Sequence, residues 1–259
     1  MRCAWLVVLA GCGRLGFGSH ATGDAPIDMP GDSAGDGSLD AARDAGGDAA
    51  YVCTGFVCDS LDGATIDPRW TLDTNAGTIA PDTTRVYRGT SSVHLHTDAI
   101  SMGTTNPRAE LLTSQGFPVT GTIHARAWMY FASPMPGSPF AQLLNFANTA
   151  GVGISMGARS AFVVDNDYTT PQYAQSTVTM LPLDRWTCLQ LDLPSGISGT
   201  THVYVDGVEV PDIATSQTNQ PAPDHVYLGI EWVGTVTSQA AFDAWIDEIA
   251  IDTNPVPCN

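Results

Sequence analysis

Hydrophobic and polar positions alternate most regularly in residues 121–132. Every second position from 123 to 131 is small, aliphatic or Phe, and the positions between them are polar-tipped: His124, Arg126, Trp128 and Tyr130. A period of two separates two faces only in a β-strand. We expect a central strand of a two-sheet sandwich, with one face in the core and the other lining a ligand surface. An amphipathic sheet surface without a ligand is the alternative.

Ten further short runs have strand character and are separated by turn residues. They cover residues 56–60, 92–97, 109–113, 142–147, 152–156, 161–164, 186–193, 202–210, 225–232 and 244–251. No sustained period of 3.6 residues accompanies them. Asp206 and Gly207 are typical of a tight primed hairpin turn, because both accept positive φ angles. The pattern predicts an all-β sandwich or jelly roll.

The N-terminus has one Arg and a short apolar run that ends in Leu9-Ala10-Gly11-Cys12. This run is too short to span a bilayer. It resembles a bacterial lipoprotein signal, which is cut before a Cys that then carries a lipid. The resemblance implies a signal peptide over residues 1–11, a lipid on Cys12 and a place on the outer or cell-surface membrane of a bacterial envelope. A chance match in an Ala-rich chain is the alternative.

Residues 12–50 are rich in Asp, Gly and Ala, and from position 24 to 48 an Asp recurs every four residues. A helix would stack these like charges, and the interleaved Gly and Pro disfavour it further. We expect a disordered, solvated tether. Residues 51–259 then suffice for one well-buried domain.

The 259-residue chain has a formal charge of −17, with 27 acidic and 10 basic side chains. This charge disfavours nucleic acid as a partner. All ten basic residues are Arg, so mechanisms that need an ammonium base or a Schiff base are excluded. The sequence indicates no required cofactor, and we expect a monomer.

Four Cys remain in the predicted domain: Cys53, Cys58, Cys188 and Cys258. In an exported chain such a set favours two disulfides over a metal site. Three pairings are possible. We favour a bridge from the N-terminal segment to Cys258, because the first and last strands of many sandwiches are neighbours.

Several segments together resemble the concanavalin A-like lectin/glucanase sandwich. They are residues 91–96, 108–111, 124–131, 186–193, 203–207 and 245–249. The resemblance implies a jelly roll of two antiparallel sheets, of a kind found both in laminin-G-like binding modules and in glycanases. It therefore specifies the fold and says little about activity.

Arg108-Ala109-Glu110-Leu111 is similar to a strand of alginate-lyase-like and heparin-lyase-like polysaccharide lyases. In those families the Arg helps to neutralise the uronate carboxylate, and an amide, a His and a Tyr complete the site. Asn145 could supply the amide, but Ala147 stands where a His is expected, and Glu231 falls near the expected Tyr. The resemblance thus implies charge neutralisation without the usual base.

Two other kinds of site need acidic residues in particular positions. Glycoside hydrolysis needs two facing carboxylates, and the domain has only four Glu, none in a Glu-x-Asp-x-Glu strand. Asp247 and Glu248 are adjacent on the last strand, so we expect one of them to point outward. In many proteins of this fold the last-strand Asp holds a structural calcium, so the resemblance implies a possible calcium at Asp247, near Asp59 or Asp62; a solvated acid is the alternative.

The sequence predicts a cell-surface lipoprotein that binds a polysaccharide or other glycan without cleaving it. The candidate ligand-binding residues are His94, His96, Arg108, Glu110, His124, Arg126, Trp128, Tyr130, Asn145 and Glu231. A uronate-specific polysaccharide lyase is the first alternative, and a structural or adhesion module is the second. If Arg108 and Arg126 lie on neighbouring strands, they would select an acidic glycan.

Overall fold

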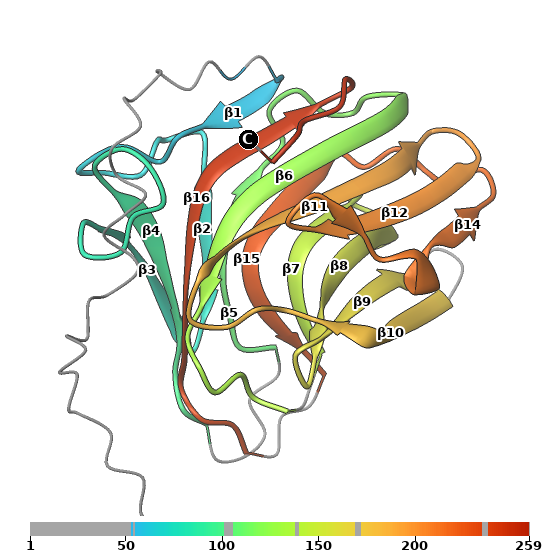
Figure 1. Cartoon of the computed structure of the whole chain (residues 1–259). Helices are drawn as coiled ribbons and strands as arrows, with labels where there is room; N and C mark the ends of the chain where they lie inside the picture. Colours follow the sequence, from blue (N-terminus) through green and yellow to red (C-terminus); the bar gives the residue numbers. More distant parts are fainter. Residues whose placement is uncertain are drawn as a thin grey trace, which may run out of the picture. The chain divides into compact units, whose positions relative to one another are not determined.

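The chain folds as a sandwich of two antiparallel β-sheets (Figure 1). The computed structural model describes residue 53 and residues 55–100, 106–137, 140–168, 172–234 and 238–258. These residues belong to a compact unit that spans Asp48–Asn259. The predicted signal peptide, the Cys12 lipid site and the tether lie outside the described residues. In the described part, no helix is long and apolar enough to cross a membrane.

One sheet has nine strands. They are β1 (Val57–Asp59), β3 (Gly77–Asp82), β4 (Ser92–Thr97), β6 (Gly121–Phe131), β11 (Trp186–Ser195), β12 (Gly199–Val205), β13 (Val208–Glu209), β14 (Thr215–Gln217) and β16 (Phe242–Asp252). The order is β13-β12-β11-β6-β16-β4-β3, while β1 also pairs with β16 and β14 with β12. The strand with the clearest alternation, β6, lies between β11 and β16, which confirms the predicted central strand.

The other sheet has seven strands in the order β10-β9-β8-β7-β15-β5-β2. They are β2 (Thr71–Asn75), β5 (Arg108–Thr113), β7 (Phe140–Ala147), β8 (Gly153–Arg159), β9 (Phe162–Asp167), β10 (Gln172–Met180) and β15 (His225–Val233). A short 3-10 helix, η2 (Pro211–Ile213), lies between β13 and β14. The consecutive strands β5 and β6 belong to different sheets, and this crossover decides where the candidate site residues lie.

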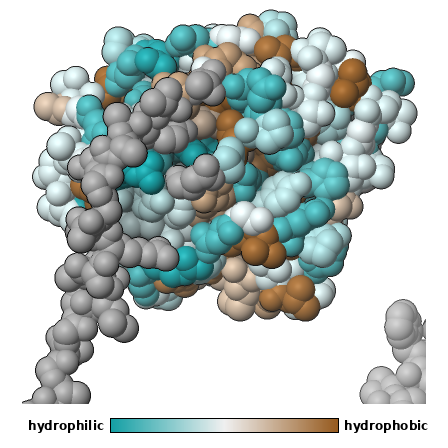
Figure 2. All heavy atoms as spheres, turned by 45° about the horizontal axis from the view of Figure 1, so that its top comes forward, coloured by the Kyte–Doolittle hydropathy of each residue, from teal (hydrophilic) through white to brown (hydrophobic). Residues whose placement is uncertain are grey.

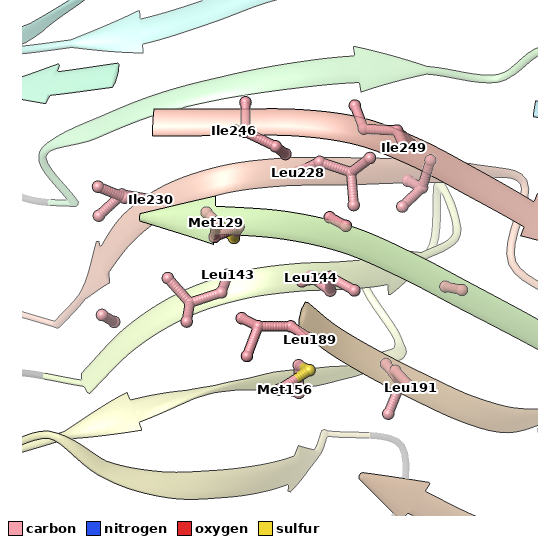
Figure 3. Close-up of a cluster of buried hydrophobic side chains, with 14 of the residues drawn as sticks. Met129, Leu143, Leu144, Met156, Leu189, Leu191, Leu228, Ile230, Ile246 and Ile249 are labelled. Carbon is pink, nitrogen blue, oxygen red and sulfur yellow. The ribbon is translucent and has the colours of Figure 1, made fainter. Parts of the chain in front are cut away.

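The core fills the space between the sheets (Figure 3). On β6, the five alternate residues from Ile123 to Phe131 are at most 1 % exposed. They meet residues of the other sheet such as Leu144, Met156 and Leu228. Burying one large aliphatic or aromatic side chain stabilises the fold by about 1.5 to 3 kcal/mol, so this face holds β6 in register.

The hairpin turn at Asp206-Gly207 is confirmed, with φ angles of 52° and 76° between β12 and β13. The sequence analysis missed four strands, β2, β3, β10 and β14. β2 and β3 are partly exposed edge strands and carry few apolar residues to mark a period.

The four Cys of the domain form two disulfides, as predicted, but not with the favoured pairing. Cys53 bonds Cys58, and Cys258 bonds Cys188 of β11. After β16 the chain turns back across β6 and β11, where Arg126 Nη1 donates to the Pro257 carbonyl (2.8 Å). The C-terminal Cys therefore meets β11 rather than the N-terminal segment.

Candidate functional site

The outer face of the seven-stranded sheet is polar. On β5, Ala109 and Leu111 point into the core, so Arg108 and Glu110 point away from it. Nine side chains on this side of the sheet form what we call the polar face: Asp73, Arg108, Glu110, Gln142, Asn145, Ser155, Tyr168, Tyr227 and Glu231. Although it faces away from the core, Glu110 is only 2 % exposed, so its neighbours on the polar face cover it.

Two carboxyl groups lie on neighbouring strands of the polar face. Glu110 lies opposite Gly229 of β15 and Glu231 lies opposite Arg108, so the two Glu are diagonal neighbours. Burial raises the pKa of Glu110 well above its usual value; Glu231 and Asp73 raise it further, and Arg108 opposes them. Glu110 Oε1 is buried and has no hydrogen-bond partner among the described residues. Glu110 therefore favours its protonated form, and its Oε1 keeps unused hydrogen-bonding capacity beneath the surface of the polar face.

The second carboxyl group has a different environment. Burial raises the pKa of Glu231, whereas a hydrogen bond from Asn106 and the charge of Arg108 lower it. Asn106 Nδ2 donates to Glu231 Oε1 at 2.9 Å. Two carboxyl groups in unequal environments can act as one hydrogen-bond donor and one acceptor toward the same ligand.

A bulge in β7 adds two amides to the polar face. The register of β7 against β8 shifts between Gln142 and Leu144, so Gln142 and Asn145 share a face although they are three residues apart. Gln142 Nε2 donates to Ser155 Oγ (3.0 Å) and Tyr168 Oη (2.8 Å), and Tyr168 Oη donates to Asn145 Oδ1. Without the bulge, strict alternation would place Gln142 on the opposite side of β7 from Asn145, facing the core. The sequence analysis therefore did not identify Gln142 as a site residue. The result is a preorganised amide and hydroxyl cluster.

Arg108 is the only cationic side chain of the polar face. Its Nε lies 2.9 Å from Asp73 Oδ1. Glu110 and Glu231 also act on it electrostatically and raise its pKa, against the lowering effect of burial. With Glu110 protonated, this face carries two carboxylates, Asp73 and Glu231, and one Arg that is already paired. Such a surface repels a polyanion more than it attracts one.

A histidine that the sequence analysis did not select lies beside the polar face. His225 alternates with Tyr227 on β15, and their rings meet edge to face at 5.0 Å. Its Nδ1 contacts Asp224, whose Oδ2 accepts the Thr149 N–H at 2.9 Å. In the register of β15 and β7, His225 lies directly opposite Ala147. A His is thus present next to the position where β7 lacks one.

The ten predicted ligand-binding residues do not form one site. The structure brings together four of them on the polar face: Arg108, Glu110, Asn145 and Glu231. The other six lie on the outer face of the nine-stranded sheet: His94, His96, His124, Arg126, Trp128 and Tyr130. Arg108 and Arg126 are on different sheets, so the condition under which the two Arg would select an acidic glycan is not met.

Part of this second face is covered. Arg126 is 3 % exposed beneath the C-terminal segment. The ring of Trp128 is stacked on Tyr87, with centroids 3.8 Å apart. Tyr130 is half-buried, and the guanidinium of Arg85 lies 3.9 Å from its ring centroid. The aromatic rings of β6 are therefore occupied by contacts within the protein, which leaves less of them for a sugar.

The last strand, β16, differs from the expectation that one of Asp247 and Glu248 points outward. Asp247 and Glu248 are both at most 1 % exposed, because β16 has a bulge there and Glu248 has a φ of 43°. Asp247 accepts the N–H groups of Tyr87 (2.9 Å), Arg88 (3.3 Å) and Glu248 (2.8 Å). These donors fit a hydrogen-bonded carboxylate better than a calcium ligand. Calcium at Asp247 stays a prediction.

The structure also places Gly153-Ile154-Ser155-Met156-Gly157, a Gly-x-Ser-x-Gly string, inside β8. A nucleophile elbow needs a strand that feeds a helix, whereas β8 leads into β9. Ser155 hydrogen-bonds Gln142, so its hydroxyl helps to order the amide cluster.

Comparisons with known proteins agree with this architecture. A family model described as the concanavalin A-like lectin/glucanases superfamily matches residues 103–255. The chain belongs to this superfamily. No curated protein matches the chain.

Two solved structures illustrate how this superfamily member compares with other sandwiches. "Cellulose induced protein, Cip1" is 18 % identical with a TM-score of 0.63, over 78 % of this chain and 100 % of that one. An endo-β-1,4-glucuronan lyase from the fungus Trichoderma reesei is 14 % identical with a TM-score of 0.57, over 74 % and 94 %. At these identities the likeness concerns the fold alone.

Proposed function

We propose that the polar face binds a neutral polysaccharide without cleaving it. The single observation that carries the proposal is the buried Glu110 carboxyl, whose Oε1 has no partner among the described residues. A buried polar atom without a hydrogen bond costs about 1 to 3 kcal/mol. A sugar hydroxyl that displaces the side chains covering Oε1 would satisfy it, and the neighbouring amides and tyrosines are the groups that proteins use to orient polar ligands.

The charge of the polar face favours a neutral glycan over an acidic one. Arg108 is already paired with Asp73, and Glu231 adds a further acidic group. A uronate chain would bring repeated carboxylates to this acidic surface, whereas hydroxyl groups can both donate to Glu231 and accept from protonated Glu110. Figure 2 shows one side of the molecule, on which teal and pale residues predominate and the hydrophobic residues form small separate groups.

Calorimetry with the hexasaccharides of neutral β-glucans and with oligoglucuronate tests this proposal. We expect heat of binding with a neutral chain and none with oligoglucuronate at about 1 mM. At this concentration even weak binding, with a free energy of about −4 kcal/mol, is detected. The absence of binding by every neutral glycan would contradict the proposal. Binding of oligoglucuronate alone would replace it with the acidic-glycan interpretation.

A polysaccharide lyase is the second candidate, and the position of His225 favours it. Asp224 at Nδ1 leaves Nε2 of His225 as the free ring nitrogen, which could accept a proton beside Tyr227. Incubation with glucuronan and alginate would give an unsaturated product if this candidate is correct. New reducing ends without unsaturation would instead indicate hydrolysis through Glu110 and Glu231.

We further propose that the domain is held at the bacterial cell envelope by a lipid on Cys12. Leu9-Ala10-Gly11-Cys12 supports this anchor. Mass spectrometry of the N-terminal peptide of the exported protein should find an acylated Cys12. An uncut N-terminus or an unmodified Cys12 would contradict it.

A further inference from the structure

Two histidines and an aspartate converge on the outer face of the nine-stranded sheet, away from the polar face. On β4, Val93 and Leu95 point into the core, so His94 and His96 both point outward. Asp243 of β16 lies directly opposite His96 in the register of the two strands. This arrangement comes from two paired strands rather than from a loop, so the backbone fixes the three side chains at close range.

The three side chains meet at one point. Asp243 Oδ1 is 2.8 Å from His94 Nε2 and 2.7 Å from His96 Nδ1. One potential ligand atom from each residue lies within 4.8 Å of the other two. The other described histidines each face a single carboxylate: His124 with Asp192, His202 with Glu209, and His225 with Asp224. In the described part of the chain, this is the one group of three His, Cys, Asp or Glu side chains close enough to hold a metal ion.

The neighbours hold both rings in place. His96 Nε2 lies 3.4 Å from Asp98 Oδ1, so Asp98 can hold a proton on Nε2 when Nδ1 exchanges its 2.7 Å contact with Asp243 for a metal ion. A carboxylate behind a metal-binding His is a frequent arrangement. The ring of His94 is stacked on Trp245, with centroids 4.6 Å apart and planes 17° apart. Trp245 is itself fixed, because its Nε1 donates to Asp82 Oδ2 at 2.8 Å.

We propose that His94 Nε2, His96 Nδ1 and the Asp243 carboxylate bind a divalent transition-metal ion of the zinc class. Two imidazoles and one carboxylate suit such an ion, whereas calcium and magnesium prefer oxygen ligands. The three side chains are 30 %, 28 % and 39 % exposed, so an ion can enter from solvent and keep a water as a further ligand. Bond lengths of about 2.0 to 2.2 Å require only small movements of the side chains.

Titration calorimetry of the full chain, made without a polyhistidine tag, tests the site with ZnCl2 as the probe. We expect one zinc ion per chain. Removal of a carboxylate behind a metal ligand weakens binding by about 10- to 100-fold, which is the effect expected for Asp98→Asn as a positioning residue. Loss of a ligand itself, in His94→Gln or Asp243→Asn, should weaken binding by more than about 100-fold.

His202→Gln is the matched control, because His202 is on the same sheet and faces one carboxylate, Glu209, at 2.7 Å. It should leave the zinc affinity unchanged. Circular dichroism should show that each variant is folded, and Asp243→Asn decides the question if His94→Gln does not fold. CoCl2 should give visible absorption bands that His94→Gln removes. The absence of stoichiometric zinc binding, or zinc binding that survives both ligand substitutions, would overturn the proposal.

Discussion

Asp165 is a core-facing acid that the sandwich buries completely. It lies on β9 beside Val163, is 0 % exposed, and accepts a hydrogen bond from Thr215 Oγ1 of β14. Burial raises the pKa of Asp165 to about 7, against the lowering effect of the Thr215 hydrogen bond. Sequence alternation could place Asp165 on the core face of its strand, but it could not reveal that Thr215 would cover it.

The raised pKa predicts a pH dependence of stability. Between pH 4 and 7 the folded state keeps a proton that the unfolded state has lost, so the free energy of unfolding falls as pH rises. Asp165→Asn should remove about 2 to 4 kcal/mol of this fall, because an amide does not titrate in this range. The amide oxygen can still accept the hydrogen bond from Thr215, so we expect the variant to fold. Urea unfolding of the wild type and of Asp165→Asn at pH 4 and pH 8 measures how much the free energy of unfolding of each protein changes with pH. Parallel profiles for the variant and the wild type would show that Asp165 is not protonated in the folded state.

At the scale of elements, regular alternation predicted the strands that face the core on one side and a polar surface on the other. β6 and the turn at Asp206 are examples, because a period of two or an Asp-Gly pair is a local property. The bulges in β7 and β16 were not predictable, because each depends on the partner strand. They decide that Gln142 faces outward and that Glu248 is buried.

The two disulfides should contribute unequally to stability. The bond between Cys188 and Cys258 joins residues 70 positions apart, whereas Cys53 and Cys58 are 5 positions apart. A longer loop restricts the unfolded chain more, so the Cys188→Ser, Cys258→Ser double variant should lose about 2 to 4 kcal/mol. The Cys53→Ser, Cys58→Ser double variant is the matched control and should lose less. Equal losses in chemical denaturation would show that loop length does not govern the effect.

At the scale of the whole molecule, strand order separates residues that look equivalent in the sequence. Arg108 and Arg126 are close along the chain, but the crossover between β5 and β6 places them on opposite outer faces. The sequence therefore predicted the fold class, but not how its candidate residues are grouped. That grouping changes the proposed ligand from an acidic glycan to a neutral one, because Arg108 is left among carboxylates.

The most direct test of the central claim compares the two outer faces by matched substitutions. Tyr227 belongs to the polar face and Tyr130 to the nine-stranded sheet, and both are half-buried. Calorimetry with the neutral glycan that binds best should show at least about a tenfold loss of affinity for Tyr227→Ala, as expected when one contact of about 1.4 kcal/mol is removed. Tyr130→Ala should change the affinity by less than about twofold. A loss confined to Tyr130→Ala would contradict the account and place the ligand on the opposite sheet.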